Sequence, residues 1–283
     1  MLNVISPEAA SLADRLGPFG HPCWLCEHYA FDIPLAVDAG AALAAARNTA
    51  RGLLADINIV PREGRRKKLL AADMESTIIA CECVDELAAL AGAGREVAAI
   101  TERAMKGEID FADALRQRVA LLKGLPLSTL QRVYDEHVRL NPGARALVAT
   151  MRAQGAATLL VSGGFTWFAE RVAQAAGFDS YSANVLLDDG ERLLGTVQEP
   201  IRGRESKREA SERAAIMHGI PLSDTLAVGD GANDLAMVKS AGLGVAWHAR
   251  PILAEAAAAR IDHADLTALL YLQGYREAEI VNA

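Results

Sequence analysis

Three short apolar runs, each ending abruptly in polar residues, dominate the pattern of the chain. They are residues 69–72 before Asp73, residues 158–161 before Ser162, and residues 225–228 before Gly229 and Asp230. Continuous apolar runs of this length are typical of strands buried on both faces of a parallel sheet. Ligands of open α/β sheets bind just outside the carboxyl ends of the strands, so the polar residues after each run are candidates for chemistry.

The pattern around these runs alternates between strands and helices from residue 142 onward. We expect helices at 145–154, 165–176, 205–218 and 234–240, strands at 157–161, 225–228 and 243–246, and two short Ala- and Leu-rich helices at the end. Residues 181–187 and 192–197 are predicted to form a hairpin around Asp188-Asp189-Gly190. This alternation predicts βαβ units and a mainly parallel, doubly wound sheet.

Two other regions differ from this pattern. Residues 78–139 show only helical spacing, with Gly107 expected to end one helix and Asp110 to begin the next. Residues 1–65 read as strands at 2–5, 24–33 and 57–60 with helices at 7–16 and 37–54, the order β-α-β-α-β of a small α+β domain. The basic run 62–68 is predicted to be a solvated linker. We therefore expect a small N-terminal domain at 1–65 and a core domain formed by 66–77 together with 140–283. Residues 78–139 are expected to be a helical region inserted into that core.

The net charge restricts the partners. A formal charge of −7 argues against nucleic acid, because binding there is driven by Lys and Arg on phosphates. Any phosphate site must therefore be made positive locally. No Lys or Arg precedes Arg15 and no apolar run approaches the roughly 18 residues of a membrane span, so we expect a cytoplasmic protein without a secretory signal.

The chain has four cysteines, Cys23, Cys26, Cys81 and Cys83. Cys23 and Cys26 form a C-x-x-C pattern, which can mark a redox pair or half a zinc site. A second C-x-x-C is absent from the sequence, and only His21 and His28 lie nearby as further ligands. We therefore interpret the cysteines as small buried hydrophobic side chains.

The polar residues after the apolar runs resemble, in order and spacing, the four signature motifs of the haloacid dehalogenase superfamily of phosphotransferases. The matching stretches are Asp73-Met74-Glu75-Ser76-Thr77, Ser162-Gly163-Gly164, Lys207, and Gly229-Asp230-Gly231-Ala232-Asn233-Asp234. Taken singly, each has a structural alternative: Asp73 or Asp234 as a helix cap, the glycines as a turn, Lys207 as a surface lysine. Together they imply the superfamily's fold, in which the inserted helices form a cap over the sheet.

The resemblance implies a role for each residue. Asp73 would be the nucleophile that forms an aspartyl phosphate, and Glu75 the acid/base. A Mg²⁺ cofactor would be held by Asp73, Asp230 and the backbone carbonyl of Glu75. The phosphoryl oxygens would be bound by the remaining motif residues, namely Ser162, Gly163, Lys207 and Asn233, with Asp234 orienting Lys207.

Three further stretches, residues 82–88, 100–111 and 115–125, resemble the cap of the phosphoserine phosphatase family within that superfamily. By position, Glu82 would receive the substrate ammonium and Arg118 its carboxylate, with Met105 and Phe111 forming an apolar wall. The implied reaction is hydrolysis of O-phospho-L-serine to L-serine, the last step of serine biosynthesis. Phe111 and Arg118 are seven residues apart and so lie on one helix face, and a guanidinium suits bidentate binding of a carboxylate.

The sequence departs from the family at Glu75, where an Asp is usual. The extra methylene moves the carboxyl group outward by about 1.5 Å, and misplacement on that scale can cost on the order of 100-fold in rate. Three alternatives therefore stay open: another small phosphomonoester as substrate, transfer to an alcohol acceptor, or a regulatory homologue with impaired catalysis. The N-terminal domain is interpreted as an ACT-like packing or dimerisation module, and a homodimer is an option that the sequence leaves open.

Overall fold

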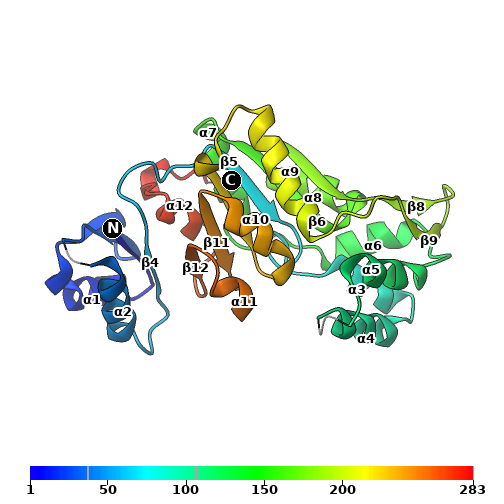
Figure 1. Cartoon of the computed structure of the whole chain (residues 1–283), viewed down its shortest axis with the longest axis horizontal. Helices are drawn as coiled ribbons and strands as arrows, with labels where there is room; N and C mark the ends of the chain where they lie inside the picture. The colour runs from blue at the N-terminus through cyan, green and yellow to red at the C-terminus, as the bar shows by residue number, and fades with distance from the viewer. Residues whose placement is uncertain (37, 106–107, 283) are drawn as a thin grey trace.

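The chain folds around two sheets of different kinds, joined to a layer of helices (Figure 1). The computed structural model describes residues 1–36, 38–105 and 108–282, without the side chain of Met105. Figure 1 places the small N-terminal sheet at one end, the large sheet in the middle and helices α3 to α6 at the other end. Within the described residues, no helix has the length and apolarity needed to cross a membrane.

The large sheet is six-stranded, and every adjacent pair of strands is parallel. In spatial order it consists of β12 (Ala259–Ile261), β11 (Leu243–Trp247), β10 (Thr225–Gly229), β5 (Leu69–Asp73), β6 (Ala157–Phe165) and β7 (Ser180–Asn184). The predicted parallel sheet is confirmed. The three apolar runs form the adjacent strands β10, β5 and β6, so their carboxyl ends meet at one edge.

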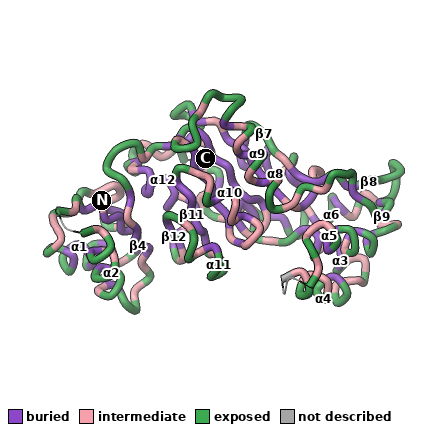
Figure 2. Tube along the Cα trace, in the orientation of Figure 1, coloured by how far each residue is buried: buried purple, intermediate pink, exposed green. Residues whose placement is uncertain are grey.

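Helices cover both faces of this sheet. Alternate strand residues point to opposite sides, so continuously apolar strands present an apolar surface on each face. Ala71 and Val161 belong to an apolar cluster on one face, whereas Leu70, Ala72 and Leu160 belong to a cluster on the other. The first face is covered by α9 (Arg204–Met217), α10 (Leu235–Ser240) and α11 (Pro251–Ala254), and the second by α7 (Ala144–Ala153), α8 (Thr166–Ala176) and α12 (Ala268–Leu272). The central strands β5, β10 and β11 are accordingly buried along their length (Figure 2), whereas the edge strand β7 begins with the exposed Ser180 and Tyr181.

The inserted region is helical, as expected. Its helices are α3 (Cys83–Leu90), α4 (Gly94–Met105), α5 (Phe111–Ala120) and α6 (Ser128–His137). Asp110 caps α5 by accepting a hydrogen bond from Asp113 N, whereas the predicted stop at Gly107 lies outside the described residues. The domain boundaries at residues 65, 77 and 139 stay predictions.

A hairpin from the second half of the chain joins the helical layer. It pairs β8 (Leu186–Asp188) with β9 (Leu193–Val197), and Leu193 exchanges backbone hydrogen bonds with Gly124 and Leu125 beyond α5. The single predicted strand 181–187 is therefore wrong, because the chain leaves the large sheet after Asn184 and begins the hairpin at Leu186. Likewise, the predicted helix 234–240 begins with a 3-10 turn, η3 (Ala232–Asp234), and the end of the chain holds strand β12 between its two predicted helices.

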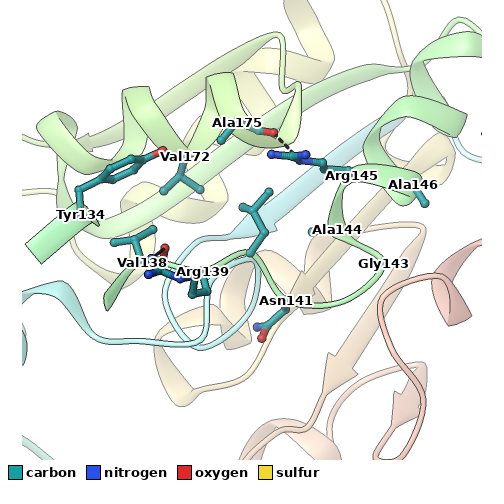
Figure 3. A pocket seen from close by; sticks show the side chains of 11 residues that line it. Tyr134, Val138, Arg139, Asn141, Gly143, Ala144, Arg145, Ala146, Val172 and Ala175 are labelled. Carbon is teal, nitrogen blue, oxygen red and sulfur yellow. Dashed lines mark hydrogen bonds between the residues drawn. The ribbon is translucent and has the colours of Figure 1, made fainter. Parts of the chain in front are cut away.

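The helical layer is joined to the sheet by two connectors that pair with each other. Ile79 and Leu140 form an antiparallel bridge, and Asn141 N donates to Ile78 O at 2.8 Å. A depression of about 440 Å³ lies at this junction, between Tyr134 at the end of α6 and the start of α7 (Figure 3). Among the described residues that line it, none is a predicted site residue, so this depression is separate from the predicted site.

The N-terminal sheet is four-stranded and antiparallel. Its spatial order is β2 (Cys23–Cys26), β3 (Ala30–Ile33), β1 (Leu2–Ile5) and β4 (Asp56–Ile59), and it carries α1 (Ala9–Arg15), η1 (Gly17–Phe19) and α2 (Ala39–Thr49). The predicted order β-α-β-α-β is wrong, because residues 27–29 form a turn that splits the expected strand 24–33 in two. His28 in this turn has a φ of 61°, a left-handed conformation that continuous strands do not contain.

This small sheet is attached to the large one by buried polar contacts. Asp32 pairs with Arg65, and the two side chains are 4% and 10% exposed. Asn58 and the backbone of Arg260 exchange two hydrogen bonds of 2.9 and 2.8 Å, which join β4 to β12. The prediction of a solvated linker is thus wrong at Arg65, and also at Lys67, which is buried and donates to the carbonyls of Gly64 and Ser223. The remaining 3-10 turns are η2 (Leu222–Asp224) and η4 (Glu277–Glu279).

Candidate active site

The predicted site residues of the core converge at the carboxyl edge of the large sheet. Asp73 ends β5, and its partner in the register of β6 is Val161, directly before Ser162. On the other side, Ala72 pairs with Val228 of β10, two residues before Asp230. Parallel register alone therefore brings residues distant in sequence to neighbouring positions.

A buried ion cluster occupies this edge. Lys207 Nζ lies 2.6 Å from Asp73 Oδ1 and 2.6 Å from Asp234 Oδ1. Asp73, Lys207 and Asp234 are 3%, 2% and 0% exposed. Lys207 stands in the first turn of α9, and the packing of that helix on β5 and β6 brings it to the acids. Burial alone would lower the pKa of Lys207, but the charges of Asp234 and Asp73 outweigh burial and raise it.

The turn after β10 holds Asp234 in place. Asp234 Oδ2 accepts hydrogen bonds from the backbone N–H groups of Asp230 at 3.2 Å and Gly231 at 3.1 Å. Gly229 is required beside it, since a Cβ atom there would lie 2.4 Å from Asp234 Cγ. One carboxylate oxygen of Asp234 thus accepts hydrogen bonds from the turn, and the other accepts one from Lys207. Asn233, in the same turn, is half-buried.

The acids at this edge outnumber the ammonium beside them. Ligand atoms of Asp73, Asp230 and Asp234 all lie within 4.8 Å of one another. Burial and the charge of Asp234 raise the pKa of Asp230 to about 7, and they also raise the pKa of Asp73, which Lys207 opposes. Closely spaced carboxylate oxygens with unbalanced negative charge are the donor set that a hard divalent cation prefers. The residues present therefore fit a metal ion.

The glycine-rich end of β6 lies on the other side of Asp73. Ser162 Oγ accepts a hydrogen bond from Gly164 N at 2.8 Å. Phe111 of α5 covers this stretch so closely that a Cβ atom on Gly163 would lie 2.9 Å from Phe111 Cζ. Phe111 thus brings the helical layer down onto this end of the sheet.

Asn184 is a positioning residue that the sequence analysis missed. It is 2% exposed, and its Nδ2 donates to Gly163 O at 2.8 Å and to Arg202 O at 3.0 Å. The Arg202 backbone N–H donates back to its Oδ1 at 2.6 Å. Asn184 thus ties the glycine-rich end of β6 to the segment that leads into α9 and Lys207. A polar residue directly after the apolar Ala183 was the available signal, but it did not show which distant carbonyls it would bind.

Glu75 points between the sheet and the start of α3. Its Oε1 accepts a hydrogen bond from Cys83 N at 2.9 Å, and its Oε2 accepts one from Ser162 Oγ at 3.3 Å. The carboxylate also fills the space that a Cβ atom on Gly164 would need, since that atom would lie 2.6 Å from Oε2. Burial, with the charge of Glu82, raises the pKa of Glu75 to about 7. The longer side chain is therefore accommodated without leaving the site.

The predicted recognition residues lie above the same edge. Glu82 is exposed to water, and Ser76 Oγ donates to its Oε1 at 2.6 Å. Partial desolvation raises the pKa of Glu82, while the positive charge of Arg118 acts in the opposite direction. Arg118 is half-buried and donates to Ala114 O of its own helix at 3.4 Å. The predicted role of Met105 concerns a side chain outside the described residues.

Comparisons with known proteins show the family to which the chain belongs. Residues 70–239 match the family model described as haloacid dehalogenase-like hydrolase. The phosphoserine phosphatase of Albidiferax ferrireducens is 48% identical over 211 residues, which cover 72% of this chain and 89% of that protein.

Two solved structures match nearly the whole chain, including the small N-terminal sheet. A hydrolase of the same family from Salmonella enterica serovar Typhi superposes with a TM-score of 0.85 at 28% identity, covering 96% of this chain and 97% of that one. A probable phosphoserine phosphatase from Vibrio cholerae superposes with a TM-score of 0.83 at 30% identity, covering 98% of this chain and 87% of that one. With its sheet, acid-rich edge and helical insert, this chain belongs to the haloacid dehalogenase-like hydrolases.

Proposed function

We propose that the protein is a Mg²⁺-dependent phosphatase that hydrolyses O-phospho-L-serine to L-serine and phosphate. The observation that carries this proposal is the position of a buried Asp73–Lys207 pair beneath two oppositely charged recognition groups, Glu82 and Arg118. The name of the Albidiferax ferrireducens relative supports the same substrate. The place in serine biosynthesis follows from that substrate.

The substrate offers three charged groups, and each meets its complement in this site. Glu82 would receive the ammonium group, and the guanidinium of Arg118 would bind the carboxylate. The phosphoryl oxygens would be bound by the groups at the sheet edge, namely Ser162 Oγ, Gly163 N, Lys207 Nζ and Asn233 Nδ2. Phe111 and Met105 would enclose the short apolar part of serine, so the helical layer would select the substrate while the sheet edge holds the reacting group.

The reaction would proceed in two steps at Asp73. In the first, a carboxylate oxygen of Asp73 attacks phosphorus, the bond from phosphorus to the serine oxygen breaks, and Glu75 gives its proton to that oxygen. In the second, Glu75 takes a proton from water, and the resulting hydroxide displaces phosphate from the aspartyl phosphate and restores Asp73. Lys207 would stabilise charge on the phosphoryl oxygens. A cation held by Asp73, Asp230 and the Glu75 carbonyl would supply further charge neutralisation.

The decisive experiment incubates purified protein with O-phospho-L-serine and Mg²⁺, with and without EDTA, and measures both serine and phosphate. We expect equal release of the two products, lost with EDTA and reduced about 10⁴-fold or more in Asp73→Asn. Asp14→Asn, an exposed helix residue, is the matched control and should behave as the wild type.

Other outcomes separate the alternatives. Phosphate released from other monoesters but not from phosphoserine would point to a different substrate. Serine released with less than one equivalent of phosphate, in the presence of an alcohol, would indicate transfer. If Glu75→Gln left turnover unchanged, Glu75 would not be the acid/base.

A further inference from the structure

The thiols on either side of Glu82 are not used by the proposed mechanism. Cys81 and Cys83 flank this recognition residue at the start of α3, where the first connector enters the helical layer. The four cysteines differ in exposure: Cys83 is buried, Cys81 and Cys26 are half-buried, and Cys23 is exposed. The interpretation of the cysteines as buried side chains is therefore wrong for Cys23 and only partly right for Cys26 and Cys81.

The backbone between the two thiols is extended. Glu82 has φ −102° and ψ 104°, an extended conformation. Residues i and i+2 of an extended segment point to the same side, with about 6.6 Å between their Cα atoms. Disulfides span Cα separations of roughly 4.4–6.8 Å and Cβ separations of roughly 3.5–4.5 Å, so a bond between Cys81 and Cys83 requires the chain to bend at Glu82 until the two Cβ atoms reach that distance.

The surroundings give the two thiols different accessibility. Cys81 follows the exposed Ala80 and can be reached from water, whereas Cys83 is 0% exposed. The hydrogen bond from Cys83 lowers the pKa of the Cys81 thiol and outweighs the effect of burial. An oxidant would therefore meet Cys81 first, and Cys83 would be the neighbouring thiol that closes the bond.

We propose that Cys81 and Cys83 form a modification site, which a peroxide converts to a disulfide across Glu82. In the first step, the Cys81 thiolate sulfur attacks hydrogen peroxide, the O–O bond breaks, and Cys81 sulfenic acid and hydroxide are produced. In the second, the sulfur of Cys83 attacks the Cys81 sulfur, the S–O bond breaks, and the Cys83 proton leaves with the hydroxyl group as water. The sulfurs lose two electrons in total, and the peroxide gains them.

The disulfide would act on the proposed active site through two contacts. The backbone N–H of Cys83 is the donor that holds Glu75 Oε1 at 2.9 Å. Glu82, between the two cysteines, is held by Ser76 at 2.6 Å. Drawing the Cα atoms of residues 81 and 83 together moves both the donor and Glu82, and this consequence for activity rests on the proposed phosphatase function.

The test uses the full-length, Mg²⁺-loaded protein treated with hydrogen peroxide, alkylated and digested with trypsin. Peptide 69–95 contains Cys81 and Cys83 but neither Cys23 nor Cys26, so its mass reports this site alone. We expect it to resist alkylation and to lack two hydrogens. Phosphoserine hydrolysis should fall by about 10- to 100-fold and return with dithiothreitol, which does not reverse methionine sulfoxide.

Two variants make the result specific. Cys81→Ser, with Cys81→Ala as a second version, should keep its activity through the same reversible cycle of peroxide and dithiothreitol. The double variant Cys23→Ser/Cys26→Ser should lose and regain activity as the wild type does. Because the mass measurement needs no substrate, failure of phosphoserine hydrolysis in untreated protein would count against the proposed function and not against the disulfide.

Several results would overturn the proposal. One is a peptide 69–95 that stays fully alkylated after peroxide, and another is a disulfide confined to Cys23 and Cys26. The third is a reversible loss of phosphoserine hydrolysis in Cys81→Ser that equals the loss in the wild type. A complete Cys81–Cys83 disulfide with unchanged phosphoserine hydrolysis would reject the link to the active site.

Discussion

The sheet edge and the helical layer above it hold their charges in opposite ways. At the edge, Asp73, Lys207 and Asp234 are almost fully buried, and their contacts are short bonds within the protein. Above it, Glu82 is exposed and Arg118 is half-buried, with one hydrogen bond of 3.4 Å to its own helix. The first set is fixed before any substrate arrives, whereas the second has unused bonding capacity.

This difference matches the two tasks of the proposed reaction. Groups that stabilise developing charge act best when they are oriented in advance in a site that excludes water. Groups that recognise a substrate must exchange water for ligand, so they need to be accessible. The comparison predicts that changes at the sheet edge affect both folding and turnover, whereas changes above it affect substrate affinity.

The largest effect is expected for Lys207→Met. Removal of the ammonium leaves the buried Asp73 and Asp234 without their shared partner, and breaking a buried ion pair costs about 3–5 kcal/mol. Phosphoserine hydrolysis should also fall by about 10²–10³-fold, the effect of losing a charge-stabilising donor. Urea unfolding and phosphate release measure the two quantities.

The matched control is Lys68→Met, since Lys68 is 67% exposed and pairs with Asp224 at the surface. Its unfolding free energy should change by less than about 1 kcal/mol, with normal activity. In the double variant Lys207→Met/Asp234→Asn, stability should be partly recovered but activity should not. Wild-type stability of Lys207→Met would contradict the assignment of a buried ion cluster.

An intermediate effect is expected for Arg118→Ala. If Arg118 binds the substrate carboxylate, its loss removes a hydrogen bond between charged groups worth about 1.5–3 kcal/mol, and KM for phosphoserine should rise by about 10- to 100-fold. Hydrolysis of p-nitrophenyl phosphate, which has no such carboxylate, should not change. Arg116→Gln is the control on the same helix, because Arg116 is exposed and pairs with Asp113 and Glu199. Equal losses with both substrates would show that Arg118 serves the phosphoryl group instead.

The sheet and its reactive edge could be predicted from the sequence because the signals are local. Residues 69–72 and 226–228 are continuously apolar, and each run ends in a polar turn, which specifies a buried strand and its carboxyl end. Parallel register then requires Asp73 and Asp230 to meet. The roles assigned to them came from the family resemblance, which no composition or periodicity could supply.

The predictions from sequence failed where contacts between residues far apart in the chain determine the structure. Strand β12 has three residues with the charged Arg260 at its centre, and it is held by Asn58 from the other sheet, so no apolar run marks it. Arg65 reads as part of a solvated basic run until Asp32 is known to lie beside it. The contacts of Asn184 with Gly163 and Arg202 likewise depend on the fold.

The smallest effect is expected for Ser76→Ala, which tests whether the recognition groups are held at all before substrate binds. The Ser76 hydroxyl donates to Glu82 at 2.6 Å, although Ser76 has a φ of 55°, a left-handed backbone that serine adopts infrequently. Loss of a hydrogen bond worth about 0.5–1.5 kcal/mol should raise KM for phosphoserine by about two- to tenfold. The kcat should stay unchanged, because Ser76 positions Glu82 and does not touch the reacting group. In a double-mutant cycle with Glu82→Ala, the two effects should not add, since Ser76 acts only through the Glu82 carboxylate and that variant lacks it. Additive effects, or a lower kcat at constant KM, would show that Ser76 acts on the reacting group, as the residues of the sheet edge are proposed to do. The two regions would then differ less in how they contribute to the reaction.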